Sequence, residues 1–327
     1  MAEHFHARFL QGPTYDPDIP SLVFETDGTV IGFIGTSVVP MLLDGRVIRS
    51  VSPGPLITTQ SARAVSAFLI KSLLAGQQEF TYSDRQTVAF QKLFVRVGAR
   101  PMHPRCVWWE VRLRPLSNRL QRVRRTPLRT AAAGALAVPA MLVDSLLKPL
   151  RPTPRTERPQ RNEPLSADTV IGALSEFTAT YRLRPHYDEA FWRWRMLELA
   201  AAKRLGRPRA QAVYEGDLLL GWFVYMAASR GASRVLQLCA RPGNEAAVLH
   251  ELVADADRHG VVALRGRLEP EFDLALREMR VSLTHGNCLL VHARNTAVFE
   301  AFASERALVT QLDGEAWISA TFAGAEA

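Results

Sequence analysis

The stretch LVFETDGTVIGFIG, residues 22–35, carries the clearest local structural pattern in the chain. Two apolar runs flank Asp27-Gly28, and an Asp-Gly pair between apolar runs is typical of a tight turn joining antiparallel strands. A second pair, Asp44-Gly45, separates VVPMLL from RVIRSV in the same way. The sequence therefore predicts two consecutive β-hairpins in this region.

Helical and strand patterns alternate after these hairpins. Apolar residues at helical spacing predict helices, and short apolar runs between turn residues predict strands. Up to residue 111, the predicted elements are a helix at 65–73, a strand at 80–83, a helix at 89–94 and a strand at 107–111. Farther along, helices are expected near 167–180, 187–203, 244–259 and 272–279, and strands near 210–215, 218–226, 234–240, 261–266, 288–292 and 316–322. This order predicts an α/β protein with mixed sheets.

One sequence pattern occurs twice. Val23-Phe24-Glu25, then Gly28 and Gly32-Phe33, resembles Val213-Tyr214-Glu215-Gly216 and Gly221-Trp222, about 190 residues later. A single repeat at this distance indicates duplication of a domain rather than a solenoid. With 327 residues, 47% of them hydrophobic, the chain is large enough for two cores.

The segment between the two patterns has a different composition. It contains eight prolines, and residues 112–162 hold 12 Arg or Lys against 2 Asp or Glu, which exceeds the net charge of +8 for the whole chain. Frequent proline disfavours long helices. We therefore predict an N-terminal domain at 1–111, a linker at 112–164 and a C-terminal domain at 165–327.

The linker combines basic and apolar stretches. Residues 131–147 are apolar apart from Asp144 and Ser145, and arginine-rich stretches flank them. Such an arrangement suits peripheral contact with an anionic membrane through 112–161, and it equally suits a short helix packed on one of the domains. Because the positive charge is confined to this segment, a nucleic-acid-binding surface is not expected.

Cysteines and histidines bear on the compartment and on metals. The three cysteines, Cys106, Cys239 and Cys288, form no CxxC pair and predict neither a disulfide framework nor a structural zinc site. The histidines lack metal-ligand spacing, so no metal is expected. The N-terminal stretch MAEHFHARFL lacks a signal-peptide core. We expect a reducing, cytoplasmic location, with the membrane contact above as an addition.

Several stretches resemble the GNAT N-acyltransferases. LVFETDGTVIGFIG is similar to that family's second and third strands, and FTYSDRQTVAFQKLFVRVGAR, residues 80–100, to its fifth strand and fourth helix. DEAFWRWRM, residues 188–196, and LDGEAWI, residues 312–318, look like tandem GNAT proteins. The resemblance covers about four-fifths of the chain. It implies two GNAT-like domains and binding of acetyl-CoA or another acyl-CoA.

The resemblance also implies a pyrophosphate-binding loop at a helix N-terminus, where glycines let phosphates approach backbone N–H groups. In the first domain the matching residues are Gln60, Arg63 and Ala64, with Arg63 and Val65 in place of glycine or alanine. The second domain offers Arg241, Gly243 and Asn244, followed by Glu245. An ordinary capped helix start explains each loop equally well.

The chemistry implied by the resemblance requires a base for the amine and an acid for the leaving thiolate. Phe94 occupies the position at which many family members have a tyrosine acid. Asp84 at a strand end, His285 before a strand and Glu110 beside two tryptophans are the candidate proton-transfer residues. Asp84 is alternatively a helix N-cap.

Three functions follow from these patterns. The first is an acyl-CoA-dependent N-acyltransferase acting on an amine of a small molecule, sugar or lipid-linked precursor. The second is a non-catalytic, degenerate tandem that binds a partner or a membrane. The third is an aminoacyl-tRNA-dependent transferase of the Fem type, which the basic linker favours but its lack of aromatic residues disfavours.

Overall fold

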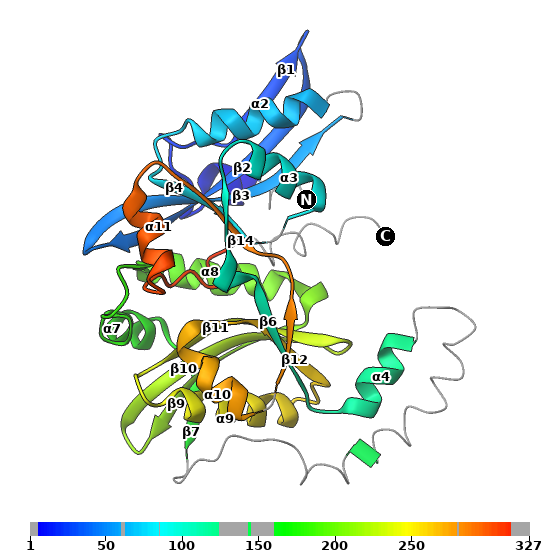
Figure 1. Ribbon diagram of the computed structural model, residues 1–327, viewed down its shortest axis with the longest axis vertical. Helices are drawn as coiled ribbons and strands as arrows, with labels where there is room; N and C mark the ends of the chain where they lie inside the picture. Colours follow the sequence, from blue (N-terminus) through cyan, green and yellow to red (C-terminus); the bar gives the residue numbers. More distant parts are fainter. Residues whose placement is uncertain are drawn as a thin grey trace. The chain divides into compact units, whose positions relative to one another are not determined.

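A computed structural model describes residues 6–59, 63–84, 86–123, 143–144, 160–279 and 281–314. Their contacts divide the chain into two compact units, and each unit contains one mixed seven-stranded sheet (Figure 1). Unit 1 comprises residues 1–106, 170–202 and 287–327, and unit 2 comprises 107–169 and 203–286.

The sheet of unit 1, sheet A, has the strand order β1-β2-β3-β4-β14-β5. Asp27 and Asp44 have positive φ, as do the glycines that follow them, so both predicted hairpin turns are present. The short strand β8 (Leu183–Pro185) pairs with β2. The strands of the main order are β1 (Leu22–Thr26), β2 (Thr29–Leu43), β3 (Arg46–Thr58), β4 (Phe80–Ser83), β14 (Leu289–Ala293) and β5 (Arg100–Met102).

Helices of unit 1 cover sheet A. Residues of α2 (Arg63–Leu74) and α3 (Val88–Arg96) share one core cluster with Ile34, Val38 and Val51 of the sheet. Helical spacing from Val65 to Leu73 predicts a buried Phe68, but this residue of α2 is 56% exposed. The remaining helical elements of this unit are η1 (Ala7–Gln11), η2 (His103–Cys106), α7 (Ala167–Phe177), α8 (Glu189–Ala201) and α11 (Thr296–Ala303), although the first residues of α7 fall in unit 2.

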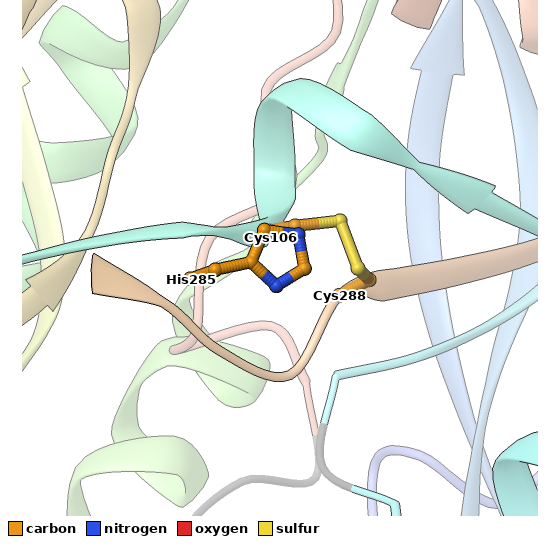
Figure 2. A group of neighbouring side chains, drawn as sticks. All are labelled: Cys106, His285 and Cys288. Carbon is orange, nitrogen blue, oxygen red and sulfur yellow. A yellow bond between two sulfur atoms is a disulfide. The ribbon is translucent and has the colours of Figure 1, made fainter. Parts of the chain in front are cut away.

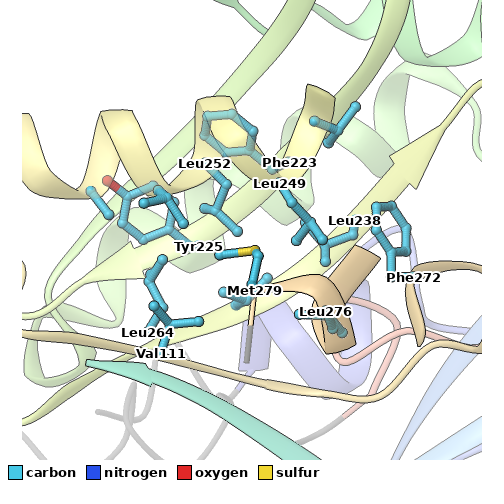
Figure 3. Close-up of a cluster of buried hydrophobic side chains, with 14 of the residues drawn as sticks. Val111, Phe223, Tyr225, Leu238, Leu249, Leu252, Leu264, Phe272, Leu276 and Met279 are labelled. Atoms are coloured by element: carbon cyan, nitrogen blue, oxygen red, sulfur yellow. The ribbon is translucent and has the colours of Figure 1, made fainter. Parts of the chain in front are cut away.

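The sheet of unit 2, sheet B, has the order β13-β6-β12-β11-β10-β9-β7. Its core joins one sheet face to α9 (Glu245–Arg258) and α10 (Asp273–Glu278), as Figure 3 shows. The remaining helical elements are α4 (Pro115–Val123), η4 (Lys203–Leu205) and η5 (Pro270–Phe272). The strands are β6 (Val107–Arg112), β7 (Arg161–Pro164), β9 (Arg207–Glu215), β10 (Leu218–Ala227), β11 (Ala232–Ala240), β12 (Ala263–Arg267) and β13 (Ser282–His285).

The repeated glycines have the same packing role in both units. A Cβ on Gly32 would collide with Val65 and Leu69 of α2, and a Cβ on Gly221 would collide with Val248 of α9. Each glycine therefore lets a helix lie close to the second strand of its hairpin. This shared close approach explains why the sequence pattern recurs.

The units differ from the contiguous domains predicted at 1–111 and 165–327. Strand β14 comes from the C-terminal part of the chain but lies between β4 and β5 of sheet A. Conversely, β6 follows directly after unit 1 but lies between β13 and β12 of sheet B. Each unit is thus completed by a strand from the other half of the sequence.

The predicted linker at 112–164 is partly ordered against unit 2. Its first part forms α4, and the buried carboxylate of Asp144 accepts hydrogen bonds from the backbone N–H groups of Leu116 and Ser117 and from the Ser117 hydroxyl. Asp144 thus caps the N-terminus of α4 from outside that helix. Most of the predicted apolar helix at 131–147 lies outside the described residues, as does the strand predicted at 316–322. None of the described helices has the length and apolar character needed to cross a membrane.

Candidate active site

Strands β3 and β4 of unit 1 separate soon after they meet. They pair in parallel only at Ser50 with Phe80 and at Val51 with Thr81, although β3 continues to Thr58. Beyond this point β3 contains Pro53-Gly54-Pro55, and neither proline has a backbone N–H to donate to a ladder. The sequence itself therefore prevents a continuous β3–β4 ladder, and the carboxyl end of β4 lies beside the point where the two strands diverge.

The side chains at the end of β4 alternate between the two faces of sheet A. Val51 belongs to the core beneath α2, and its partner Thr81 points to the same face. Tyr82 therefore points to the opposite face, and Asp84 follows directly after the last residue of β4. Asp84 is only 3% exposed, so a predicted candidate base is buried at the end of this strand.

A second carboxyl group approaches this strand end from the C-terminal segment. The Asp313 carboxylate accepts hydrogen bonds from the backbone N–H and the hydroxyl of Thr310 at 2.8 and 2.7 Å, and from the Tyr187 hydroxyl. The Tyr82 hydroxyl donates to the Asp313 carbonyl oxygen at 2.7 Å. Burial raises the pKa of the Asp313 carboxyl group above its ordinary value, although these hydrogen bonds oppose the shift.

Gly314 brings the two carboxyl groups into one neighbourhood. A Cβ on residue 314 would overlap the Asp84 carboxyl group, so only glycine allows this close approach. Asp84, Asp313, Tyr82 and Tyr187 form what we call the buried carboxyl cluster. Asp84 comes from the end of β4, Tyr187 from just before α8, and Asp313 from the segment after α11. Three stretches far apart in the sequence therefore build one site within unit 1.

Positively charged side chains lie near this cluster in unit 1. Arg195 of α8 is buried and stacks on Phe191, with its guanidinium carbon 4.7 Å from the ring centroid. Burial lowers the pKa of Arg195, while nearby Tyr82, Asp313 and Tyr187 oppose this change. A cation at this position favours the ionised form of Asp313.

Arg8 adds a second buried cation. It forms an ion pair with Glu198 of α8, and burial lowers the pKa of Arg8 to about 10 despite this partner. Its guanidinium carbon lies 5.4 Å from the Trp194 ring centroid. This pair extends the polar interior of unit 1 along α8, next to Arg195.

The structure does not bring Glu110 and His285 together, although both belong to unit 2. His285 of β13 pairs with Val107 of β6, whereas Glu110 of β6 pairs with Ser282. Paired residues share a face and successive residues alternate, so Glu110 and His285 point to opposite faces of sheet B. Glu110 instead accepts from the Arg112 guanidinium at 3.1 Å. Glu110 and His285 therefore do not share a site, and their catalytic roles remain predictions.

The predicted phosphate loop of unit 2 lies wholly within the described residues, whereas that of unit 1 lies only partly within them. Gln60 lies outside the described residues, Arg63 is the first residue of α2, and Ala64 is exposed. In unit 2 the backbone N–H of Gly243 donates to the Glu245 carboxylate at 3.1 Å, and that of Asn244 donates to the Arg241 carbonyl oxygen at 2.9 Å. The chain's own carboxylate thus occupies the position expected for an anion in unit 2.

Phe94, at the position of the family's tyrosine acid, is fully buried in the core of unit 1. It cannot donate a proton, and its burial assigns it a packing role. Tyr187 and Tyr82 are hydroxyl groups that the sequence analysis did not select. The motifs DEAFWRWRM and LDGEAWI contain Arg195 and Asp313, but their resemblance gave these residues no role.

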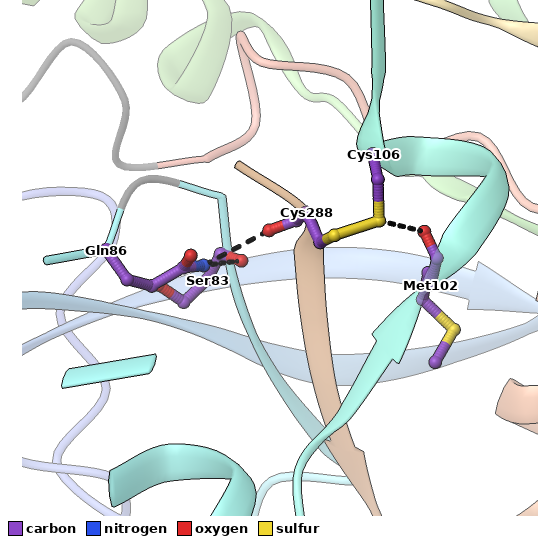
Figure 4. Close-up of a disulfide and its surroundings, with 5 residues drawn as sticks. All are labelled: Ser83, Gln86, Met102, Cys106 and Cys288. Carbon is purple, nitrogen blue, oxygen red and sulfur yellow. Dashed lines mark hydrogen bonds between the residues drawn. A yellow bond between two sulfur atoms is a disulfide. The ribbon is translucent and has the colours of Figure 1, made fainter. Parts of the chain in front are cut away.

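Two cysteines are paired, contrary to the expectation of free thiols. Cys106 and Cys288 form a disulfide within unit 1 (Figure 4). Cys239 is a buried free thiol whose pKa is raised by burial. Figure 2 shows His285, three residues before Cys288 in the chain, with these two cysteines. The possible metal-ligand atoms of these three described residues lie within 4.8 Å of one another. Its two sulfur atoms are bonded to each other.

Solved structures with a similar fold match most of the chain. A probable N-acyltransferase from Enterococcus faecalis V583 matches with a TM-score of 0.51 and 9% identity over 88% of this chain and 68% of its own. Saccharomyces cerevisiae N-myristoyltransferase, with bound myristoyl-CoA, gives 0.52 and 11% over 88% and 70%. A GCN5-related N-acetyltransferase from Anabaena variabilis ATCC 29413 gives 0.50 and 11% over 85% and 64%.

No protein-family model and no curated protein matches the sequence. At identities this low, the similarity of the solved structures shows the fold alone. The predicted resemblance to GNAT N-acyltransferases is confirmed at the level of the fold. The predicted fold class, a mixed α/β architecture with two GNAT-like units, is confirmed as well.

Proposed function

We propose that the protein is an acyl-CoA-dependent N-acyltransferase whose proton-transfer groups lie in unit 1. The observation that carries this proposal is the convergence of Asp84 and Asp313 at the carboxyl end of β4, beside the divergence of β3 from β4. The fold of the structural neighbours supports an acyltransferase, and N-myristoyltransferase among them binds myristoyl-CoA. The acceptor is an amine of a small molecule, sugar or lipid-linked precursor.

The divergence of β3 from β4 is the place where we expect an extended thioester ligand. The pairing of β3 with β4 does not extend beyond Val51, so a ligand chain would lie between the two strands there. Gln60, Arg63 and Ala64, the residues predicted from the sequence, would hold the pyrophosphate. When bound, an acyl-CoA supplies an acyl group activated by a thiolate leaving group.

The buried carboxyl cluster supplies the proton transfers. The raised pKa of the Asp313 carboxyl group lies closer to neutral pH, so its carboxylate is a stronger base toward an ammonium group. Tyr187 donates its hydroxyl proton to Asp313 and orients that carboxylate, while Arg195 favours its ionised form. Asp84 lies beside Gly314 and offers a second carboxyl group for the acceptor amine. Burial excludes bulk water from both carboxyl groups.

Thermal unfolding with and without a series of acyl-CoA thioesters tests the proposal. Ligand at a hundredfold excess over Kd stabilises by about 2.7 kcal/mol, which raises the melting temperature measurably. Arg63→Ala should weaken binding about tenfold or more, because it removes a charge-assisted contact to phosphate. Arg241→Ala is the matched control, and its affinity should stay within about twofold because Glu245 already occupies that loop.

Amine acylation by the wild-type protein and by Asp313→Asn then separates binding from chemistry. We expect the variant to bind the thioester normally and to transfer its acyl group about 10²–10⁴-fold more slowly. No melting shift with any thioester would reject the transferase proposal. That outcome would favour a non-catalytic binding module, for which the internally satisfied loop of unit 2 and the buried Phe94 are the structural arguments.

A further inference from the structure

The disulfide joins residues next to the first and the last of the four points at which the chain passes between the two units. Cys106 is the last residue of η2, directly before β6, and Cys288 directly precedes β14. The whole of unit 2, residues 107–169 and 203–286, lies between the two cysteines in the sequence. One covalent bond inside unit 1 therefore joins the first and last of these crossings.

Cys288 is connected to the loop that carries Asp84. The side-chain amide of Gln86 donates to the Cys288 carbonyl oxygen at 3.4 Å and also to the Ser83 carbonyl oxygen (Figure 4). Ser83 and Gln86 enclose Asp84 in the chain. A shift of the Cys288 backbone would therefore shift Gln86 and, with it, the loop that contains Asp84.

Cys106 is connected to the segment that carries Asp313. The guanidinium of Arg105, which is 2% exposed, donates to the Ala307 carbonyl oxygen at 2.5 Å. Ala307 begins the buried run 307–313 that ends at Asp313. The two half-cystines therefore adjoin the supports of both carboxyl groups of the buried carboxyl cluster.

We propose that the Cys106–Cys288 disulfide is a reversible redox switch that controls the candidate site of unit 1. This inference rests on the proposed function for what is regulated. A small thiol or a dithiol reductant attacks Cys288, a residue that is 6% exposed whereas Cys106 is fully buried, and forms a mixed disulfide while Cys106 leaves as thiolate. A second thiol then releases Cys288. Two electrons and two protons pass to the cysteines, and the reductant becomes a disulfide.

The surroundings accommodate the reduced state. The Sγ atom of Cys106 lies 3.5 Å from the Met102 carbonyl oxygen, which would accept a hydrogen bond from the free thiol (Figure 4). Reduction removes the covalent bond between the last residue of η2 and the residue directly before β14. Cys288, which Gln86 contacts, and Arg105, which contacts Ala307, then belong to segments that are no longer covalently joined. Asp84 and Asp313 therefore lose the covalent link between the segments that hold them.

The test uses the full chain equilibrated in glutathione buffers from reducing to oxidising. Differential alkylation with mass spectrometry reports the state of each cysteine, and Cys239, a buried free thiol, is the internal control. Hydrogen exchange of peptides covering 83–87 and 307–313 reports the support of the site. We expect Cys106 and Cys288 to change state together, and both peptides to exchange faster when the pair is reduced.

Acyl transfer by the reduced protein and by the Cys106→Ser/Cys288→Ser variant should fall about tenfold or more, because small displacements of catalytic groups are costly. Gln86→Ala should speed exchange at 83–87 in the oxidised protein without altering the thiol state. Equal exchange in both redox states, or a pair that stays oxidised throughout the glutathione range, would overturn the switch. Redox-dependent exchange without any acyl transfer would instead reject the proposed function alone.

Discussion

At the scale of single residues, two buried aspartates have opposite electrostatic settings. Burial raises the pKa of Asp313 above 3.8, whereas Asp255 in unit 2 has a lowered pKa because hydrogen bonds from Arg209 and Tyr225 outweigh its burial. A carboxyl group with a raised pKa costs stability when it ionises, which is a common property of groups retained for chemistry. Asp255, in contrast, is a stabilising member of an ion-pair network.

This difference predicts opposite effects of pH on two matched variants. The stability that Asp313 contributes is fully present below about pH 4, the ordinary carboxyl pKa in an unfolded chain. It is lost as pH rises through the raised folded-state pKa, because over this range the folded protein keeps a proton that the unfolded chain has released. Asp313→Asn cannot ionise, so this variant should gain stability relative to the wild type as pH rises from 4 to 8. Urea unfolding at a series of pH values measures the difference.

Asp255→Asn is the matched comparison. Its lowered pKa means that the stabilisation is present above the ordinary value and is lost as pH falls. At pH 8 the variant should be less stable than the wild type by about 1–3 kcal/mol, because a charge-assisted pair is weakened. This deficit should shrink toward pH 3. A gain for Asp255→Asn at pH 8, or a loss for Asp313→Asn, would contradict these assignments.

At the scale of elements, η1 approaches sheet A closely beside the point where β3 diverges from β4. The ring of Phe9 is fully buried, and a Cβ on either Gly35 of β2 or Gly54 of β3 would collide with it. Pro53 and Pro55 interrupt the ladder, while the glycine between them makes room for the aromatic ring. The segment PGP thus ends the pairing with β4 and seats η1 on the sheet.

Gly54→Ala should therefore destabilise unit 1 by about 1–3 kcal/mol through overpacking. In the Phe9→Ala background the same substitution should cost much less, because the ring is gone, and the double-mutant cycle should show clear coupling. Gly172→Ala in α7 is the control, since no atom lies near its Cβ and alanine favours a helix by about 0.5–1 kcal/mol. Additive effects of Gly54→Ala and Phe9→Ala would disprove the close approach.

At the scale of the whole molecule, the chain completes each unit with a strand from the other half of the sequence. Strand β6 enters sheet B and β14 enters sheet A, and the Cys106–Cys288 bond closes a loop with a sequence separation of 182 residues. Closing so long a loop restricts the unfolded chain much more than the folded one.

Reduction of this bond should lower the free energy of unfolding by about 5 kcal/mol in the chain-entropy account. The expected observation is a lower urea midpoint in the presence of a reductant, and the same low midpoint for Cys106→Ser/Cys288→Ser with or without it. Cys239→Ala should retain the full response to reductant, because Cys239 is not paired. An unchanged midpoint after verified reduction would contradict this expectation.

The sequence by itself determined the local elements. Asp-Gly turns specified both hairpins, the run at 80–83 specified β4, and the paired glycines at 32 and 221 indicated a duplicated unit. These features depend on neighbouring residues, through backbone conformation and the periodicity of apolar side chains. The sequence also placed Asp84 directly after the strand at 80–83, where the structure has it, and its catalytic role stays a prediction.

Only the tertiary structure decided which distant segments meet. Pairing between strands far apart in the sequence decides three features. These are the placement of β6 and β14, the pairing of Cys106 with Cys288, and the contact of Tyr187 with Asp313 across 126 residues. No local pattern encodes such partners, since β-strands of similar composition can pair in many orders. The position of Asp84 could therefore be predicted from the sequence, whereas the proposed role of Asp313 could not, because it rests on burial beside residues that lie far away in the sequence.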